Sequence, residues 1–158
     1  MEPWKEELLK ILKLSVERAS AIAKRYYSAK PMSLDELLDH LERVKIASIA
    51  TVKPSGAPHI VPVSFVQLEG KIYINTSQKS IRYRNILHQK RVCLTFIDGS
   101  RVGILEGVAK IAGETSKFSA GPVDQAFIGK YNKARRVTSN SVMVEIMPTK
   151  IFTYKGAG

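Results

Sequence analysis

Residues 75–85 place hydroxyl and basic side chains where a predicted strand runs into a predicted helix, in the sequence NTSQKSIRYRN. Ser80 suits the N-cap of that helix, so the free backbone amides and the positive dipole end would face an anion. Thr76, Ser77 and Ser80 add hydroxyl donors, and Arg82 can bind two phosphate oxygens at once. The pattern predicts a phosphate site, and an ordinary capped helix with solvated basic residues is the alternative.

A second candidate feature is Pro62, which lies inside the apolar segment 59–65. Proline cannot donate to a sheet ladder, so it marks an edge, a bulge or a backbone that faces something other than another strand. A planar heterocycle could use backbone amides around Pro62, Val63 and Ser64. An edge strand without a ligand is equally consistent with the sequence.

The distribution of charge along the chain favours the binding of a single phosphate group. Its 158 residues carry 25 Lys and Arg against 14 Asp and Glu, a formal net charge of +11. Residues 76–97 contain basic but no acidic side chains, which suits one phosphate better than a long polyanion. Nucleic-acid binding through the N-terminal helix and the Lys130–Arg136 run would depend on charge alone, because no recognition motif accompanies it.

Several classes of chemistry find no support. The single cysteine, Cys93, excludes an intrachain disulfide and a cysteine-based zinc site. The three histidines lack metal-ligand spacing, so no metal site is expected. Motifs of serine hydrolases, P-loop proteins and Rossmann folds are absent, and no catalytic residue can be assigned from the sequence.

The chain also lacks the apolar run of a membrane span and begins with acidic residues where a signal peptide would be basic. We therefore expect a cytoplasmic protein that does not bind membranes. Residues 1–30 form an N-terminal amphipathic helical extension, with one helix from Trp4 to Tyr26. We expect this helix to pack on its own domain or on a dimer partner, and a membrane or partner-helix surface is the alternative.

The remaining residues, 31–158, form one domain. Ser33 and Glu36 fit a capping box for a helix that runs to about Arg43. After it the apolar period changes to two, which predicts strands at 46–52, 59–66, 71–76, 92–97, 102–111 and 141–154, the last broken by Pro148, with helices at 81–88 and 122–131. Six strands in meander order predict a mainly β, α+β domain built as a small antiparallel barrel.

Taken together, the segments from about Leu37 to Tyr154 resemble the FMN-binding split-barrel family, whose namesake is pyridoxamine 5'-phosphate oxidase. The part with the strongest resemblance is Ser80–Ile86, which is similar to the family's Ser-x-Lys/Arg-x-x-Asn-Leu helix start. The other matching pieces, in order, are Ile49–Val52 with Gly56–Pro58, Val61–Phe65, Gly70–Thr76, Leu105–Ala109 and Ile146–Ile151.

The resemblance implies a six-stranded antiparallel split β-barrel that forms a homodimer, with one flavin in each of two clefts between the subunits. It implies that the flavin phosphate is bound by Thr76, Ser77, Ser80 and Arg82, and that the isoalloxazine edge lies against Pro62, Val63 and Ser64. Lys79 and Arg84 are second-rank phosphate candidates, because on a helix they project away from the face that carries Arg82.

Two departures from the family pattern limit the activity that the resemblance implies. The Arg-x-His pair by which the true oxidases hold pyridoxal phosphate is missing near Lys150–Tyr154, and Arg101–Ile104 lacks their glutamine beside the flavin. We therefore expect an FMN-dependent oxidoreductase or reductase that acts on a small molecule other than a B6 vitamer. A deazaflavin-dependent reductase of the same fold and a non-enzymatic flavin-binding module are the alternatives.

Overall fold

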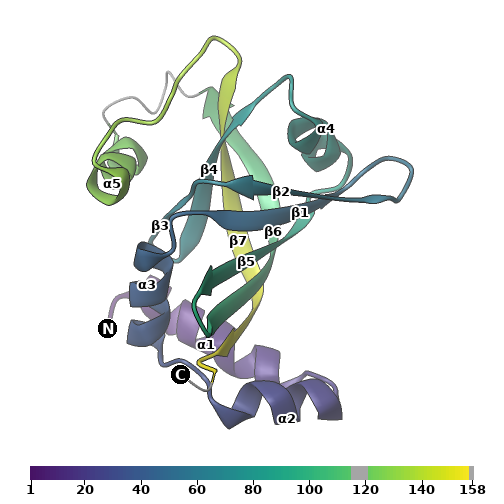
Figure 1. Ribbon diagram of the computed structural model, residues 1–158, viewed down its shortest axis with the longest axis vertical. Helices are drawn as coiled ribbons and strands as arrows, with labels where there is room; N and C mark the ends of the chain where they lie inside the picture. Colours follow the sequence, from purple (N-terminus) through teal and green to yellow (C-terminus); the bar gives the residue numbers. More distant parts are fainter. Residues whose placement is uncertain (115–120, 157–158) are drawn as a thin grey trace.

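An antiparallel sheet that curls into a half-barrel forms the centre of the structure, a computed structural model that describes residues 1–114 and 121–156 (Figure 1). Its strands are β1 (Ala47–Val52), β2 (Pro58–Val63), β3 (Val66–Leu68), β4 (Lys71–Ser77), β5 (Arg91–Asp98), β6 (Arg101–Glu114) and β7 (Ser141–Tyr154). Within the described ranges the sheet has seven strands in the order β2-β1-β5-β6-β7-β4-β3. The α+β class is confirmed, whereas the count of six strands is wrong.

The additional strand arises because the predicted strand 59–66 is two strands. β2 pairs with β1 at one end of the sheet order, and β3 pairs with β4 at the other end. Ser64 and Phe65 connect them, with the Phe65 side chain fully buried. The chain therefore crosses at these two residues from one edge of the half-barrel to the other.

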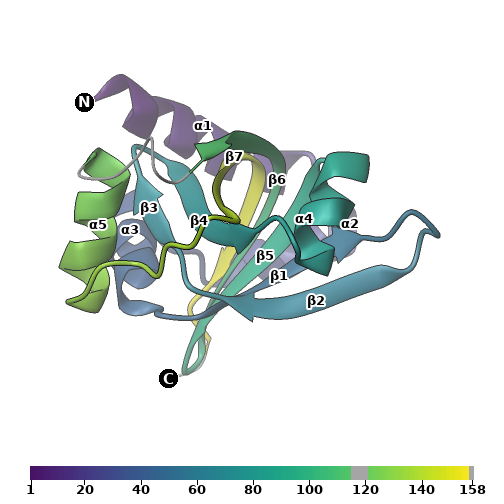
Figure 2. The same ribbon diagram turned by 90° about the horizontal axis from the view of Figure 1, so that it is seen from above.

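Helices lie at both ends of the curled sheet. They are α1 (Pro3–Glu17), α2 (Ala21–Ala29), α3 (Leu34–Arg43), α4 (Ile81–His88) and α5 (Pro122–Tyr131). The capping box of Ser33 and Glu36 is confirmed, with Glu36 N–H donating to Ser33 Oγ over 3.2 Å. Figures 1 and 2 show α4 and α5 on opposite sides of one end of the sheet, away from α1 and α2 in Figure 1.

The N-terminal extension contains two helices, so the prediction of one helix from Trp4 to Tyr26 is wrong. α1 ends at Glu17, and Ser20 starts α2 by accepting a hydrogen bond from Ala23 N–H over 3.2 Å. α1 packs on its own domain as expected: Leu8 joins the main core. Among the described residues, none of the helices has the length and hydropathy required to cross a bilayer.

Pro148 does not break the last strand, contrary to expectation. β7 is continuous from Ser141 to Tyr154, and the ladder with β6 shifts register next to Gly107, which pairs with Pro148. A Cβ atom at Gly107 would lie 2.7 Å from the Met147 carbonyl oxygen. Only glycine therefore allows the two strands to approach this closely at the bulge.

We predict that Gly107→Ala destabilises the fold by about 1–3 kcal/mol, because the added methyl group meets backbone that cannot move aside without disturbing the ladder. The matched control is Gly129→Ala in α5, where a Cβ atom would meet nothing within 4 Å. This control should be neutral or stabilising by about 0.5–1 kcal/mol. Urea unfolding of both variants measures the difference, and equal midpoints would contradict the close approach at Gly107.

Candidate functional site

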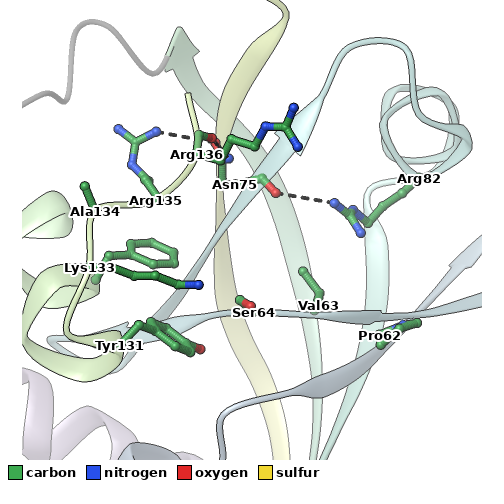
Figure 3. Close-up of a pocket in the computed structure, with 11 residues that line it drawn as sticks. Pro62, Val63, Ser64, Asn75, Arg82, Tyr131, Lys133, Ala134, Arg135 and Arg136 are labelled. Carbon is green, nitrogen blue, oxygen red and sulfur yellow. Dashed lines mark hydrogen bonds between the residues drawn. The ribbon is translucent and has the colours of Figure 1, made fainter. Parts of the chain in front are cut away.

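A pocket of about 550 Å³ lies between α4 and the segment that contains α5 and the loop after it (Figure 3). This volume is in the range of small-molecule sites. Its lining residues come from β2 and the residue after it, from β4, from α4, and from α5 with the following loop: Pro62, Val63, Ser64, Asn75, Arg82, Phe127, Tyr131, Lys133, Ala134, Arg135 and Arg136. The pocket thus brings together four of the seven residues that the sequence predicts as cofactor contacts.

Arg82 is the predicted phosphate residue that lines this pocket. Its Nε donates to Thr76 Oγ1 over 3.0 Å, and a terminal nitrogen donates to the Asn75 carbonyl over 3.3 Å. Burial lowers the pKa of the Arg82 guanidinium, although arginine stays protonated at neutral pH. α4 itself is attached to β1, because Asn85 Nδ2 donates to Thr51 Oγ1 over 3.0 Å. The Arg82 guanidinium is therefore held in place, and its other N–H groups can bind a ligand.

The three predicted hydroxyl residues do not line the pocket. Thr76 is buried behind Arg82 and accepts its hydrogen bond. Ser77 Oγ accepts from Lys79 N–H over 3.2 Å. Ser80 is the N-cap of α4, as predicted, and accepts from Tyr83 N–H over 3.1 Å. All three hydroxyls thus stabilise the junction between β4 and α4, and their role as phosphate donors stays a prediction.

Pro62, Val63 and Ser64 form the pocket wall opposite the loop after α5. β2 is the first strand in the sheet order, so its outer edge pairs with no strand of the described chain. The position of Pro62 on an edge strand is confirmed, and it agrees with the rule that proline avoids the interior of a sheet. Backbone groups along this edge are available to a ligand or to a second chain.

Tyr131, at the end of α5, closes the side of the pocket where β2 ends. Its hydroxyl accepts from Phe65 N–H over 2.9 Å and lies 2.7 Å from the Phe65 carbonyl and 2.8 Å from the Lys45 carbonyl, to one of which it donates. Burial raises the pKa of Tyr131, so the phenol stays neutral and can both accept and donate. The side chain joins α5 to the crossing between β2 and β3.

The loop after α5 brings three basic side chains to the pocket. Asn132 ends the helix in the left-handed conformation with φ of 59°, which asparagine tolerates. Arg135 forms an ion pair with Asp124 and donates to Asn75 Oδ1 over 3.4 Å. Asn75 Nδ2 in turn donates to the Arg136 carbonyl over 2.7 Å. The loop is thereby fixed to β4.

Lys130 belongs to the basic run Lys130–Arg136, but its side chain is buried in the protein interior. Its Nζ donates to the Leu41 carbonyl over 2.8 Å and lies 3.5 Å from the Phe65 ring centroid. Desolvation lowers the pKa of Lys130 to about 7. Because Lys130 is buried and Arg135 is paired with Asp124, the Lys130–Arg136 run is not a uniform basic surface. This arrangement weakens the hypothesis of nucleic-acid binding through that run.

Sequence reasoning missed the contribution of α5 and its loop to the site. The basic run was visible as a sequence feature, but its charge suggested nucleic acid rather than a pocket. Asn75 was visible as part of the strand-to-helix junction, yet its side chain faces the loop after α5. Within residues 1–114 and 121–156, no group of three or more His, Cys, Asp or Glu side chains is placed to hold a metal ion.

Comparisons with known proteins agree with the expected family. Residues 33–155 match the family described as pyridoxamine 5'-phosphate oxidase. This match contains the curled sheet and α3 to α5, and it excludes α1 and α2. A comparison with curated proteins found no significant match.

Solved structures of diverse function have a similar fold. The conserved hypothetical protein Rv2991 from Mycobacterium tuberculosis is 23% identical, with a TM-score of 0.69 over 79% of this chain and 86% of that chain. A protein described as an F420 reductase is 21% identical, with a TM-score of 0.59 over 72% and 93%. HutZ, the heme storage protein from Vibrio cholerae, is 16% identical, with a TM-score of 0.64 over 75% and 92%. At such identities the likeness shows the fold.

We predict that Tyr131→Phe destabilises the protein by about 1–3 kcal/mol, because it leaves the Phe65 N–H without its acceptor. Tyr27→Phe is the matched control, since the described residues offer the Tyr27 hydroxyl no hydrogen bond and its ring contacts are retained. Chemical unfolding measures both changes. If Tyr131→Phe lowers the free energy of unfolding no more than Tyr27→Phe does, the Tyr131 hydroxyl does not stabilise the crossing between β2 and β3.

Proposed function

Because the chain belongs to the pyridoxamine 5'-phosphate oxidase family of split barrels, we propose that its pocket binds FMN. The protein then acts as an oxidoreductase on a small molecule. A bound flavin supplies the redox chemistry, by accepting and donating electrons or hydride. The observation that supports this function best is the position of Arg82, fixed by Thr76 and Asn75 on the wall of a pocket large enough for a cofactor.

Arg82 is the residue proposed to bind the flavin phosphate. Two of its N–H groups are used by Thr76 and Asn75. The described residues offer the remaining ones no partner, so these can form charge-assisted hydrogen bonds with phosphate oxygens. Thr76 acts as a positioning residue in this assignment, because its hydroxyl orients the guanidinium. Ser77 and Ser80 contribute by shaping the turn that presents α4.

The edge of β2 is proposed to contact the isoalloxazine ring. Pro62 and Val63 line the pocket beside Arg82 on a strand edge without a strand partner in the described chain, and Ser64 follows them directly. Backbone groups on such an edge can hydrogen-bond the polar atoms of a planar heterocycle. The chain's own contribution is thus to bind and orient the cofactor between Arg82 and β2.

A heme is supported less well by these residues, although heme proteins share the fold. Among the residues that the structure describes, the lining contains no His, Cys or Met side chain, and these are the usual axial ligands of heme iron. Tyr131 is the remaining candidate ligand in the described part of the lining, and its hydroxyl is engaged by backbone groups of Phe65 and Lys45. A deazaflavin coenzyme fits the same walls as FMN and stays the alternative cofactor.

A second copy of the chain is proposed to complete the site. Three large apolar side chains are exposed on β2 and α4, the elements that also carry Pro62, Val63 and Arg82: Ile60 is 67% exposed, Ile81 51% and Leu87 58%. Their burial would favour association, and so would the free edge of β2. A homodimer would bury this face and enclose the flavin between two subunits.

Purified protein is expected to be yellow and to release FMN, identified by mass. Arg82→Ala should lower the affinity for FMN by about tenfold to a hundredfold, because a charge-assisted contact is lost. Arg84→Ala is the control, since Arg84 lies exposed on the same helix and outside the pocket lining. Fluorescence titration measures the affinities.

A colourless protein that binds neither FMN nor a deazaflavin coenzyme in titration would contradict the proposed function. Release of a deazaflavin would replace FMN by the alternative cofactor. Equal losses in the Arg82 and Arg84 variants would mean that the phosphate lies elsewhere. A flavin that is bound but reduced by no donor would favour the non-enzymatic module.

Light scattering is expected to give a mass of two 17.6 kDa chains. Ile60→Glu should shift the protein to monomers and weaken FMN binding, because a charge at the buried face opposes association. Ile22→Glu, on the 85% exposed Ile22 of α2, is the control and should leave both properties unchanged. A wild-type protein that is monomeric with FMN bound would contradict the shared site.

A further inference from the structure

Two lysines join the C-terminal ends of α3 and α5, and each donates to the other helix. Lys130 Nζ, on α5, donates to the Leu41 carbonyl in the last turn of α3 over 2.8 Å. Lys45 Nζ, just after α3, donates to the Lys130 carbonyl in the last turn of α5 over 3.0 Å. Ammonium groups are favourable at helix C-termini, where carbonyls lack partners and the helix dipole is negative. The two lysines therefore attach α5 to α3.

Lys130 also contacts the crossing between β2 and β3. Its Nζ lies 3.5 Å from the centroid of the Phe65 ring, and the hydroxyl of the next residue, Tyr131, accepts from the Phe65 N–H. Consecutive residues of α5 thus hold one residue of the crossing, Lys130 at its ring and Tyr131 at its backbone. Tyr131 lines the pocket (Figure 3), so the contacts of Lys130 help to determine where this wall lies.

No charged partner neutralises Lys130. The residue is 7% exposed, and within the part of the chain that the structure describes no carboxylate forms an ion pair with it. Two charged groups near the end of α3 act on it from a longer distance: Glu42 favours the ammonium form, and Lys45 disfavours it. Both residues are exposed, so water and salt screen their charges.

The uncharged groups around Lys130 compensate only part of its lost hydration. The Leu41 carbonyl accepts one hydrogen bond, and the face of the Phe65 ring attracts the cation. Tyr131, whose ring centroid lies 5.5 Å away, stays neutral because burial raises its pKa, and β3, which packs against α5, has no charged side chain. Desolvation is accordingly the largest cause that lowers the pKa of Lys130 to about 7.

We propose that Lys130 is a proton-sensitive positioning residue of the pocket wall: a neutral amine holds α5 against α3 and Phe65, and protonation favours detachment of α5. A neutral amine can keep the hydrogen bond to Leu41 without the desolvation of a charge. An interface that opens to water instead favours the ammonium. The inference goes beyond the binding of a flavin, because it concerns the protein with or without a ligand.

The direction of the pH dependence follows from the two environments of Lys130. A lysine in water has a pKa of about 10.4, and in the closed interface the pKa is about 7. Between these values opening is accompanied by proton uptake, so the closed interface gains stability as the pH rises from 7 and loses it as the pH falls. Below pH 7 both states are protonated, and the dependence levels off.

A titration followed by the ¹³C shift of the Lys130 Cε atom tests the state of the amine directly. We expect a midpoint near pH 7, whereas lysines in water titrate near about pH 10.4. The signal is assigned by its absence in Lys130→Met. A midpoint above about pH 9.5 would show that the closed interface tolerates the ammonium, and it would overturn the proposed role of Lys130.

Hydrogen exchange at the amides of residues 126–131 tests the attachment of α5 in flavin-free protein. Their protection factors, from which the intrinsic pH dependence of exchange is divided out, should fall about fivefold to tenfold per pH unit from pH 9 to 7 and about twofold from pH 7 to 6. Lys130→Met should lack this dependence. A wild type with the same pH profile as Lys130→Met would contradict the inference.

Lys45→Met is the matched control, because it removes the other hydrogen bond between the two helix ends. It should lower the protection of residues 126–131 at every pH and keep most of the pH dependence, which separates a lost contact from a lost titration. The amides of residues 92–97 in β5 report global unfolding. If residues 126–131 are protected as strongly as these, α5 opens only together with the whole fold, and the proposed local detachment is wrong.

This inference and the proposed function fail in different ways. If FMN occupies the pocket, it binds the closed wall, so FMN at about 100 times its Kd should raise the protection of residues 126–131 by up to about a hundredfold. A protein that binds no flavin would contradict the proposed function, and the pH profile of flavin-free protein would still establish the role of Lys130. A protein that binds FMN but has a pH-independent α5 would overturn this inference alone.

Discussion

The hydrogen bonds of the Tyr131 hydroxyl fix the crossing between β2 and β3, the two edges at which the curled sheet is open. β2 and β3 are the two ends of the sheet order, yet only Ser64 and Phe65 separate them in the chain. Backbone groups at such a crossing have no ladder partner, and leaving them unpaired in a buried place is costly. Tyr131 satisfies the Phe65 amide and by the same contact fixes α5 beside β2. The pocket exists because α5 is held there rather than elsewhere on the sheet.

Asn75 connects the two walls of the pocket. Its carbonyl accepts from Arg82, its side-chain oxygen accepts from Arg135, and its side-chain nitrogen donates to the Arg136 carbonyl. One residue of β4 therefore positions both the arginine assigned to the cofactor and the loop on the opposite wall. Through this strand the position of one wall is coupled to that of the other, which suits a site that holds a ligand between them.

Local patterns predicted those parts of the molecule that local interactions determine. The capping box at Ser33 and the N-cap at Ser80 correctly predicted where two helices start. Arg82 and Pro62, which short local motifs indicated as candidate site residues, both line the pocket. The crossing at Phe65 was missed because its cause, Tyr131, lies 66 positions away. The apolar spacing from Trp4 to Tyr26 likewise continues through Ser20 and hides the end of the first helix. Tertiary contacts of this kind leave no local signal.

The contact between α1 and β7 joins the beginning of the chain to its end. Ser15 Oγ accepts from Ile151 N–H over 2.9 Å, across 136 positions, while Leu8 completes the core. During synthesis α1 leaves the ribosome long before its partner strand is made, so its apolar face has no native surface to cover it. Docking of α1 can be completed only after β7 has emerged, and nascent chains must remain free of aggregation until then.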